Sequence, residues 1–440
     1  MRTVLRLWTL LWTSMLWTPM LGTPMLAAQA PLGEALEACL DATADADYAR
    51  LRDELLQRPD ATGDALLTAL TTRPEPLRGD TKFFVPFEGL RLEVHASAPA
   101  GRAADRLLPV LYAINWSSQY LHDVVHEHVI TADVPGYHPE QFSDAARASH
   151  VKVLNAIAFR TGGDPDALWW TGYSWGGHAC WDGALHRPGF VRGFIGRGGG
   201  PRRVSFRLLP NLVGTELLAV CGRKDDPELV WNLRELQRTR KELGLSYTYW
   251  EPADSGHDQP LPGENDAGAA LLKVVPLERP LQFTLLADGP QVEHPLFRVL
   301  EVDERLVKLP ERIGVPANLS ADDQRRQTVR NMLKQVASVR WAITTKADQP
   351  AGKPGAKVDP AKDATPGPTK VVTLSQKGVK QGRFAFRAPW FQVGDSVRVV
   401  VGKKELFAGV LQPDPRALLD EARRTGDRLR PALRVVEVAF

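Results

Sequence analysis

The feature that most constrains this sequence is the pattern Gly-x-Ser-x-Gly at residues 172–176, centred on Ser174. An apolar run typical of a buried strand, residues 167–171, comes directly before it, and a run compatible with a helix, residues 175–185, follows. A strand-to-helix turn this sharp strains its central residue, and flanking glycines let neighbouring backbone approach closely. Such a turn presents the hydroxyl of Ser174 at the carboxyl edge of a sheet, so Ser174 is a candidate nucleophile.

Suitable partners for a serine nucleophile follow it in the chain. A serine hydroxyl needs an adjacent base, and the base needs an acid that orients it. Asp225 and Asp226 come after a strand-like run, residues 216–221, and His257 comes after the next strand-like run. We therefore predict that Asp225 orients His257 and that His257 activates the serine, with Asp226 as the alternative acid.

The surrounding chain alternates short apolar runs with helical stretches, which is typical of a mostly parallel sheet covered by helices. The strand-like runs are 83–87, 90–96, 107–114, 128–134, 167–171, 191–195, 216–221 and 246–251. The helical stretches are 143–160, 175–185, 227–243 and 265–275. This alternation predicts an α/β fold.

In these features residues 82–275 resemble the single-domain α/β-hydrolases related to the prolyl oligopeptidase catalytic domain, dienelactone hydrolase and polyester-depolymerase-type esterases. The resemblance rests on residues 164–174 as the approach to the serine, on Cys221-Gly222-Arg223-Lys224-Asp225 as the acid loop, and on Gly256-His257 as the histidine loop. It implies the α/β-hydrolase fold and a triad of Ser174, Asp225 and His257. Such a triad uses no cofactor.

One departure from this family lies after its third strand, where the usual His-Gly is replaced by Asn115-Trp116-Ser117. Backbone N–H groups at this position and at the residue after the nucleophile bind the oxyanion in such enzymes. The candidates here are therefore Trp175, Trp116 and Ser117. The alternative for Trp116 is that it only packs over the sheet.

A second group of polar residues, His122, His126 and His128, raises the possibility of a metal site. If this segment is helical, His122 and His126 share one face of the helix. His128, however, begins a predicted strand, and the sequence lacks the glutamate of an H-E-x-x-H motif. We expect these residues to be loop histidines, and we expect no metal.

The first residues and the rest of the chain differ in character. Arg2 and Arg6 precede an uncharged apolar run that ends in Ala28-Gln29-Ala30, the layout of a signal peptide, with an uncleaved anchor as the alternative. The predicted divisions are a signal peptide at 1–30, a helical segment at 31–75, an α/β-hydrolase domain at 76–277, a mixed α/β extension at 278–345, a flexible linker or loop at 346–370, and a smaller β-rich C-terminal region at 371–440.

Composition excludes several classes of protein. With 43% hydrophobic and 24% charged residues the chain has the composition of a globular protein, and its net charge of +3 gives no reason to expect nucleic acid as a partner. After signal removal we expect no integral membrane segment. The three cysteines, Cys39, Cys180 and Cys221, cannot all pair, and we expect no essential disulfide.

Three hypotheses for function follow from the resemblance. The first is an exported, periplasmic or extracellular, serine hydrolase that cleaves a small or oligomeric ester through an acyl-enzyme on Ser174. The second is a serine peptidase of prolyl oligopeptidase type, which is disfavoured because the segment before the first strand is short for an access-restricting propeller. The third is a catalytically silent binding protein, since a fold does not guarantee its chemistry.

The predicted signal peptide is testable by intact-mass analysis of the protein from its native host. We expect a mass that lacks roughly the first thirty residues, because the charged start, apolar run and Ala-x-Ala ending match a cleavable signal. A mass that includes Met1 would contradict cleavage and favour the anchor.

Overall fold

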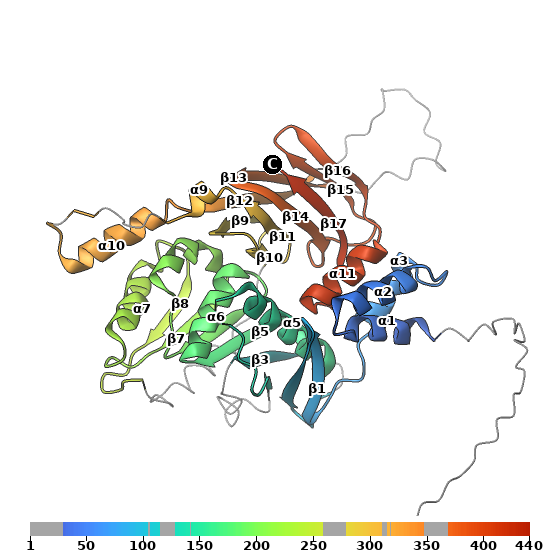
Figure 1. Ribbon diagram of the computed structural model, residues 1–440, viewed down its shortest axis with the longest axis horizontal. Helices are drawn as coiled ribbons and strands as arrows, with labels where there is room; N and C mark the ends of the chain where they lie inside the picture. The colour runs from blue at the N-terminus through green and yellow to red at the C-terminus, as the bar shows by residue number, and fades with distance from the viewer. Residues whose placement is uncertain are drawn as a thin grey trace, which may run out of the picture.

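The computed structural model describes residues 30–103, 106–114, 128–140, 142–257, 279–309, 315–316, 318–346 and 368–440. The elements form three groups, namely an α/β layer, a β-rich layer stacked on it, and a cluster of helices beside the two layers (Figure 1). Residues 1–29 of the predicted signal peptide and the predicted last helix at 265–275 lie outside the described residues.

The α/β layer is built on an eight-stranded sheet with the order β1-β2-β4-β3-β5-β6-β7-β8. Its strands are β1 (Gly79–Phe87), β2 (Leu90–Ala98), β3 (Leu108–Ile114), β4 (Ile130–Asp133), β5 (Gly163–Tyr173), β6 (Gly193–Arg197), β7 (Glu216–Val220) and β8 (Ser246–Trp250). β2 is antiparallel to β1 and β4, and every other pairing is parallel. This arrangement confirms the predicted α/β-hydrolase fold.

Helices pack against this sheet, namely α5 (Asp144–Thr161), α6 (Trp175–His186) and α7 (Pro227–Thr239), together with the 3₁₀ helix η1 (Arg203–Leu212). α5 contacts β1, β2, β3 and β5, and α6 contacts β3, β5 and β6. Leu168, Trp169 and Trp170 of β5 are all buried although they are consecutive. Consecutive apolar residues are expected where both faces of a strand are covered, which explains why β5 does not alternate.

The β-rich layer consists of two sheets that enclose one core. Its strands are β9 (Gln282–Ala287), β10 (Glu293–His294), β11 (Phe297–Val302), β12 (Ala337–Lys346), β13 (Thr369–Lys377), β14 (Val379–Arg387), β15 (Ser396–Val401), β16 (Lys404–Val410) and β17 (Ala432–Ala439). They form a sheet of order β10-β11-β14-β17 and a sheet of order β16-β15-β13-β12-β9. Trp341, Phe297 and Phe384 are buried in the shared core.

Both of these sheets combine strands from the two sides of the predicted linker at 346–370. β12 and β13 are antiparallel neighbours, with Lys346 opposite Thr369. Residues 347–367 lie outside the described part and connect these two paired strands. The predicted extension, 278–345, which also contributes α9 (Glu304–Val307) and α10 (Ala321–Met332), therefore shares one folded unit with the region 371–440.

The helix cluster combines three helices from the start of the described chain with one helix that precedes its last strand. It contains α1 (Leu32–Asp41), α2 (Asp45–Leu56), α3 (Gly63–Thr71) and α11 (Pro415–Thr425). The sequence analysis predicted a helical segment at 31–75. The structure divides it into three helices, because the chain also turns between Asp41 and Asp45, and the hydroxyl of Thr62 accepts a hydrogen bond from the N–H of Ala65 to begin α3. Leu36, Leu66 and Leu418 share one core.

A buried carboxylate, Glu293 of β10, connects all three groups. Arg187, which directly follows α6, donates to it at 2.6 Å, and Arg424 of α11 donates to its two oxygens at 2.6 and 2.7 Å. Burial alone would raise the pKa of Glu293, but the charges of Arg424 and Arg187 outweigh it and lower the pKa to about 2. Glu293 is therefore ionised at neutral pH.

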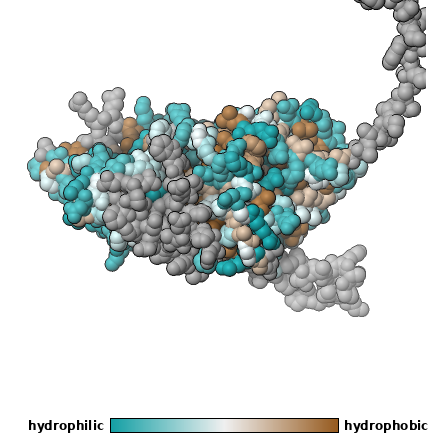
Figure 2. All heavy atoms as spheres, turned by 90° about the horizontal axis from the view of Figure 1, so that it is seen from below, coloured by the Kyte–Doolittle hydropathy of each residue, from teal (hydrophilic) through white to brown (hydrophobic). Residues whose placement is uncertain are grey.

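The surface seen from below the view of Figure 1 mixes hydrophilic residues with smaller hydrophobic areas (Figure 2). Some large apolar side chains are exposed, including Trp175 and Trp250. Within the described ranges, none of the helices is both long enough and apolar enough to cross a membrane.

We expect Glu293→Gln to lower the free energy of unfolding by about 3–5 kcal/mol, because it takes the carboxylate away from the buried guanidinium of Arg187 and leaves Arg424 with Glu421 as its remaining carboxylate partner. The contribution of Glu293 should be fully present above pH 4.5 and be lost as the pH falls toward 2, because the folded-state pKa is the lower one. Denaturant unfolding measures both effects. Glu301→Gln, which breaks the half-exposed pair with Lys380, is the control and should cost less than about 1 kcal/mol. An equal effect of the two substitutions would contradict this assignment.

Candidate active site

Ser174 lies between the end of β5 and the start of α6, in a backbone conformation with φ 51° and ψ −111°. A residue other than glycine pays on the order of 1–3 kcal/mol for such a conformation, so it persists only where the surroundings impose it. The N–H of Ser174 donates to the carbonyl of Arg197 at 2.8 Å, and its carbonyl accepts from the N–H of His178 at 3.0 Å. These two hydrogen bonds anchor the turn to β6 and to the first turn of α6.

The glycine before the turn is required by a close approach of backbone. A Cβ atom on Gly172 would lie 2.3 Å from the carbonyl carbon of Gly176. No side chain fits at that distance, so the first glycine of the Gly-x-Ser-x-Gly pattern allows α6 to start directly against the end of β5.

His257 joins Ser174 and Asp225 in a chain of hydrogen bonds. Its Nε2 atom lies 2.9 Å from the Oγ of Ser174, and its Nδ1 atom lies 2.9 Å from Oδ2 of Asp225. A neutral imidazole that donates from Nδ1 to the carboxylate and accepts the serine hydroxyl at Nε2 satisfies both contacts. The Asp225 side chain is only 6% exposed, whereas that of His257 is 45% exposed. The three residues predicted from the sequence therefore meet at one place.

The two neighbouring aspartates of the acid loop have different contacts. Oδ1 of Asp226 accepts the N–H groups of Glu228 and Leu229 at 2.8 and 3.0 Å and so caps the start of α7. The N–H of Asp226 in turn donates to Oδ1 of Asp225 at 2.7 Å. Asp225 thus faces the histidine, and Asp226 faces the helix.

The backbones of the acid loop and the histidine loop are in close contact at Gly222. A Cβ atom there would lie 2.3 Å from the carbonyl oxygen of Gly256 and 2.4 Å from that of Ser255. The N–H of Lys224 donates to the carbonyl of Ser255 at 2.9 Å. This contact fixes the distance between Asp225 and His257.

Tyr173 is a part of the site that the sequence analysis missed. Its hydroxyl donates to the backbone carbonyl of His257 at 2.7 Å, and the two rings lie 5.1 Å apart. The residue just before the nucleophile thereby supports the histidine loop. Its place inside the Gly-x-Ser-x-Gly pattern was the only available signal, because the contact spans residues far apart in the sequence.

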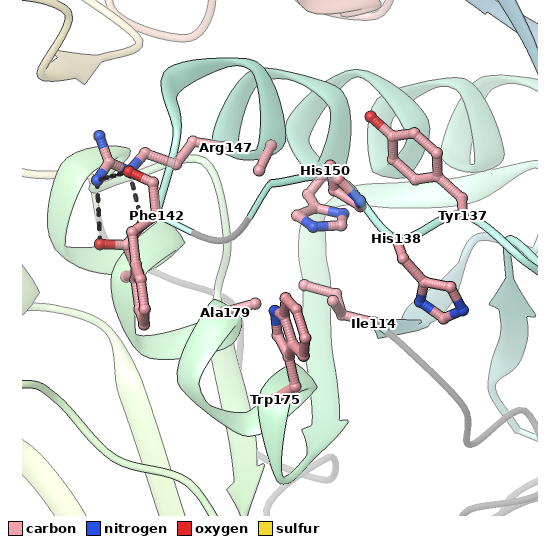
Figure 3. A pocket seen from close by; sticks show the side chains of 11 residues that line it. Ile114, Tyr137, His138, Phe142, Arg147, His150, Trp175 and Ala179 are labelled. Carbon is pink, nitrogen blue, oxygen red and sulfur yellow. Dashed lines mark hydrogen bonds and ion pairs between the residues drawn. The ribbon is translucent and has the colours of Figure 1, made fainter.

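A pocket opens beside the nucleophile between α5 and α6 (Figure 3). It is lined by Ile114, Tyr137, His138, Pro139, Phe142, Ala146, Arg147, His150, Trp175, Ala179 and Asp182. Figure 3 shows Trp175 of α6 facing His150 of α5, while Arg147 of α5 extends toward Phe142. The pocket wall thus combines the aromatic side chains of Tyr137, Phe142 and Trp175 with aliphatic and polar residues.

Arg147, Asp182 and His150 contribute no unpaired charge to this pocket. Nε of Arg147 donates to Asp182 at 2.6 Å, and the two side chains are 12% and 5% exposed. Burial lowers the pKa of His150 to about 4, so its imidazole is neutral at neutral pH. Its Nδ1 lies 3.2 Å from the hydroxyl of Tyr112. The pocket therefore suits an uncharged group.

The predicted oxyanion-binding residues are only partly described. Trp175 is the first residue of α6, so its backbone N–H lies at the N-terminus of that helix. Trp116 and Ser117 lie outside the described residues. The last described residue before them, Ile114, pairs with Gly172 in the parallel register of β3 and β5, so the chain leaves β3 at the level of the nucleophile.

The histidines considered as metal ligands are also only partly described, because His122 and His126 lie outside the described residues. Among the residues that the structure describes, no group of three or more His, Cys, Asp or Glu side chains could hold a metal ion. Cys39, Cys180 and Cys221 are separate buried thiols. Burial raises the pKa of each thiol, which keeps all three protonated at neutral pH.

The strand order and the turn at Ser174 define a protein of the α/β-hydrolase fold. Comparison of the sequence with family profiles and with curated proteins finds no match.

Solved structures that are similar include dipeptidyl peptidase 4 of Porphyromonas gingivalis (TM-score 0.37, 13% identity, 44% of this chain and 35% of that one). They also include the BES protein of Bacillus cereus (TM-score 0.38, 14% identity, 46% of this chain and 99% of that one). A third is esterase 2 of Thermogutta terrifontis phosphorylated by paraoxon (TM-score 0.35, 14% identity, 44% of this chain and 91% of that one). The match thus spans about a third of the peptidase chain. At this level of similarity we transfer no activity from these proteins.

We expect Gly222→Ala to separate the acid loop from the histidine loop, because its methyl group would overlap two carbonyl oxygens. Such overpacking costs about 1–3 kcal/mol, which thermal unfolding would detect. Gly289→Ala is the matched control, since a Cβ atom there meets nothing within 4 Å. Equal melting temperatures for the two variants would show that the loops are not held by this contact.

Proposed function

We propose that this protein is a serine hydrolase that cleaves an ester bond through an acyl-enzyme on Ser174. The observation that carries the proposal is the unbroken chain of contacts from Ser174 Oγ through His257 to Asp225, with both distances at 2.9 Å. A nucleophile, a base within hydrogen-bonding distance and a buried acid that orients the base are the parts that this chemistry needs.

In the proposed reaction, Ser174 Oγ attacks the ester carbonyl as Nε2 of His257 takes the hydroxyl proton. Asp225 stabilises the resulting imidazolium. When the carbon–oxygen bond of the leaving group breaks, Nε2 gives the proton to the departing alcohol. Water then attacks the acyl-enzyme with the same base, and the carboxylic acid leaves while the Ser174 hydroxyl is restored.

The tetrahedral intermediate carries a negative charge that needs hydrogen-bond donors. In our proposal the Trp175 N–H supplies one donor, and its position at the start of α6 adds the positive end of the helix dipole. Trp116 and Ser117 remain the candidates for the second donor, because the chain leaves β3 beside the nucleophile.

The pocket beside Ser174 favours an ester over a peptide with a free amino terminus. A peptide ammonium needs a carboxylate partner in the pocket. Among the described residues of the pocket wall, Asp182 is the only carboxylate, and Arg147 already pairs with it. An uncharged acyl or alkoxy group packed on Trp175 and Phe142 meets the requirements of this wall.

A substrate screen tests the proposal. We expect a fluorophosphonate probe to label Ser174, and we expect short-chain aryl esters to be hydrolysed faster than aminoacyl arylamides. Faster turnover of the arylamides would instead establish a peptidase. A folded protein that neither reacts with the probe nor turns over either substrate would be a binding protein with a silent hydrolase fold.

Substitutions in the proposed triad should have unequal effects on ester turnover. Ser174→Ala, His257→Ala and the double variant should each lower ester turnover on the order of a millionfold. The two single effects should not add in the double variant, because the residues act as a unit. Asp225→Asn should lose roughly ten-thousandfold, because the imidazole is then held in the wrong tautomer.

Asp226→Asn is the control, and we expect turnover close to wild type because asparagine also caps a helix. If Asp226→Asn lost most of its ester turnover and Asp225→Asn lost little, the acid of the triad would be Asp226. Wild-type turnover by folded Ser174→Ala would refute the mechanism.

A further inference from the structure

A second cavity lies where α1, β1, α5 and α11 meet. It is lined by Glu37, Leu40, Asp41, Phe83, Phe84, Val85, Pro86, Lys152, Ala156, Phe159, Arg160, Ala422, Arg423, Gly426 and Arg428. None of these residues lines the pocket beside Ser174. The cavity is therefore separate from the proposed active site.

Lys152 of α5 is the unusual residue of this cavity, because it is only 6% exposed. Within the described part of the chain, no carboxylate or carbonyl group forms an ion pair or hydrogen bond with its amino group. The end of α11 covers its stem, since a Cβ atom on Gly426 would lie 3.1 Å from Lys152 Cγ. An ammonium group with so little exposure and no anion in contact with it is costly, so an anion bound beside Lys152 would be favoured.

The charges around Lys152 are mostly positive. Arg423 of α11 donates to the carbonyl groups of Leu40 and Thr43 at 3.1 and 3.2 Å, which holds its guanidinium at the cavity. Arg428 and Arg160 share a single carboxylate, that of Glu37, at 2.6 and 3.7 Å. Three arginines and one lysine thus share the cavity with two acidic residues, Glu37 and Asp41.

Burial lowers the pKa of Lys152 to about 7, and the charge of Arg423 acts in the same direction. The other charged groups that act on it are Asp45 of α2, Asp41 at the end of α1, and Glu88 in the β1–β2 turn, all of which favour the ammonium. They do not outweigh burial. An anion bound in the cavity would place a negative charge beside Lys152. Its binding near neutral pH would therefore be coupled to the uptake of a proton by Lys152.

The remaining wall of the cavity is apolar, with side chains from all four elements. Leu40, Phe83, Val85, Phe159 and Ala422 contribute to it. A fully hydrated anion such as phosphate gains nothing from these surfaces, whereas an anion with a short hydrocarbon group buries apolar area against them.

We propose that this cavity binds a small carboxylate with a short apolar group, whose oxygens pair with Lys152 and Arg423 while its hydrocarbon part lies against the apolar wall. The ligand would touch α1, α5 and α11 together, so its binding stabilises the docking of the helix cluster onto the hydrolase layer. The proposal does not depend on the reaction at Ser174.

Titration of the full chain with butanoate, followed by calorimetry and thermal unfolding, tests the proposal. We expect butanoate to bind with one-to-one stoichiometry and to raise the melting temperature, while the uncharged butanamide does neither. Binding should be stronger at pH 6 than at pH 9, because Lys152 is protonated only below about pH 7. Inorganic phosphate should give a smaller shift.

Lys152→Met is the decisive variant, and it should weaken butanoate binding about tenfold or more and remove its pH dependence. Lys82→Met, at an exposed lysine of β1, is the matched control and should bind butanoate like wild type. Lys152→Met should fold, because it removes a buried amine. Its gain in melting temperature over wild type should be largest below pH 7 and shrink toward pH 10.5, where the unfolded-state amine also loses its proton.

Three outcomes would overturn the proposal. Butanoate binding that survives in Lys152→Met would place the carboxylate elsewhere, for example beside Ser174. Equal shifts from butanamide and butanoate would show that charge plays no part. A phosphate shift as large as that of butanoate would show that the cavity does not select an apolar carboxylate.

Discussion

The ion pairs of Glu293 join three groups of elements, each of which has a hydrophobic core of its own. Helix α6 begins beside Ser174 and ends before Arg187, which donates to Glu293. The strained turn at the nucleophile therefore lies at one end of a helix whose other end is fixed by the β-rich layer and by α11. Buried charges are favourable only when every partner is in place, so this cluster selects one arrangement of the three groups over others of similar packing.

The site could be predicted from the sequence to a large extent because its signals are local. Parallel strands place their carboxyl ends at one edge of a sheet, so a serine, an acid and a histidine that each follow a strand converge without any long-range information. A local signal in the sequence also distinguishes Asp225 from Asp226. Asp226 precedes Pro227, and an aspartate before a proline at the first helical position is a typical cap, which leaves Asp225 for the histidine.

The β-rich layer and the helix cluster could be predicted only in part, because long-range pairing determines them. The stretch rich in proline and lysine suggested a domain boundary, but it connects β12 to its partner β13. No local sequence pattern distinguishes a linker between two domains from a loop between two paired strands. β10 has two residues, too few for any periodicity. The sequence of α11 does contain helix signals, namely Asp414 as its N-terminal cap and Gly426 at its C-terminal end. Strand-like segments on both sides of it led to the prediction of a β-rich region.

Helix α5 relates the two cavities to each other through simple helix geometry. Residues two positions apart on a helix point in nearly opposite directions, and His150 faces the pocket beside Ser174 while Lys152 faces the second cavity. Most of α5 is buried, as expected for a helix covered on both sides. Asn155 also donates to the carbonyl of Thr425 at 3.0 Å, which ties α5 to the end of α11. The two cavities therefore share α5 as a common wall, with Arg147 and His150 on one side and Lys152 on the other.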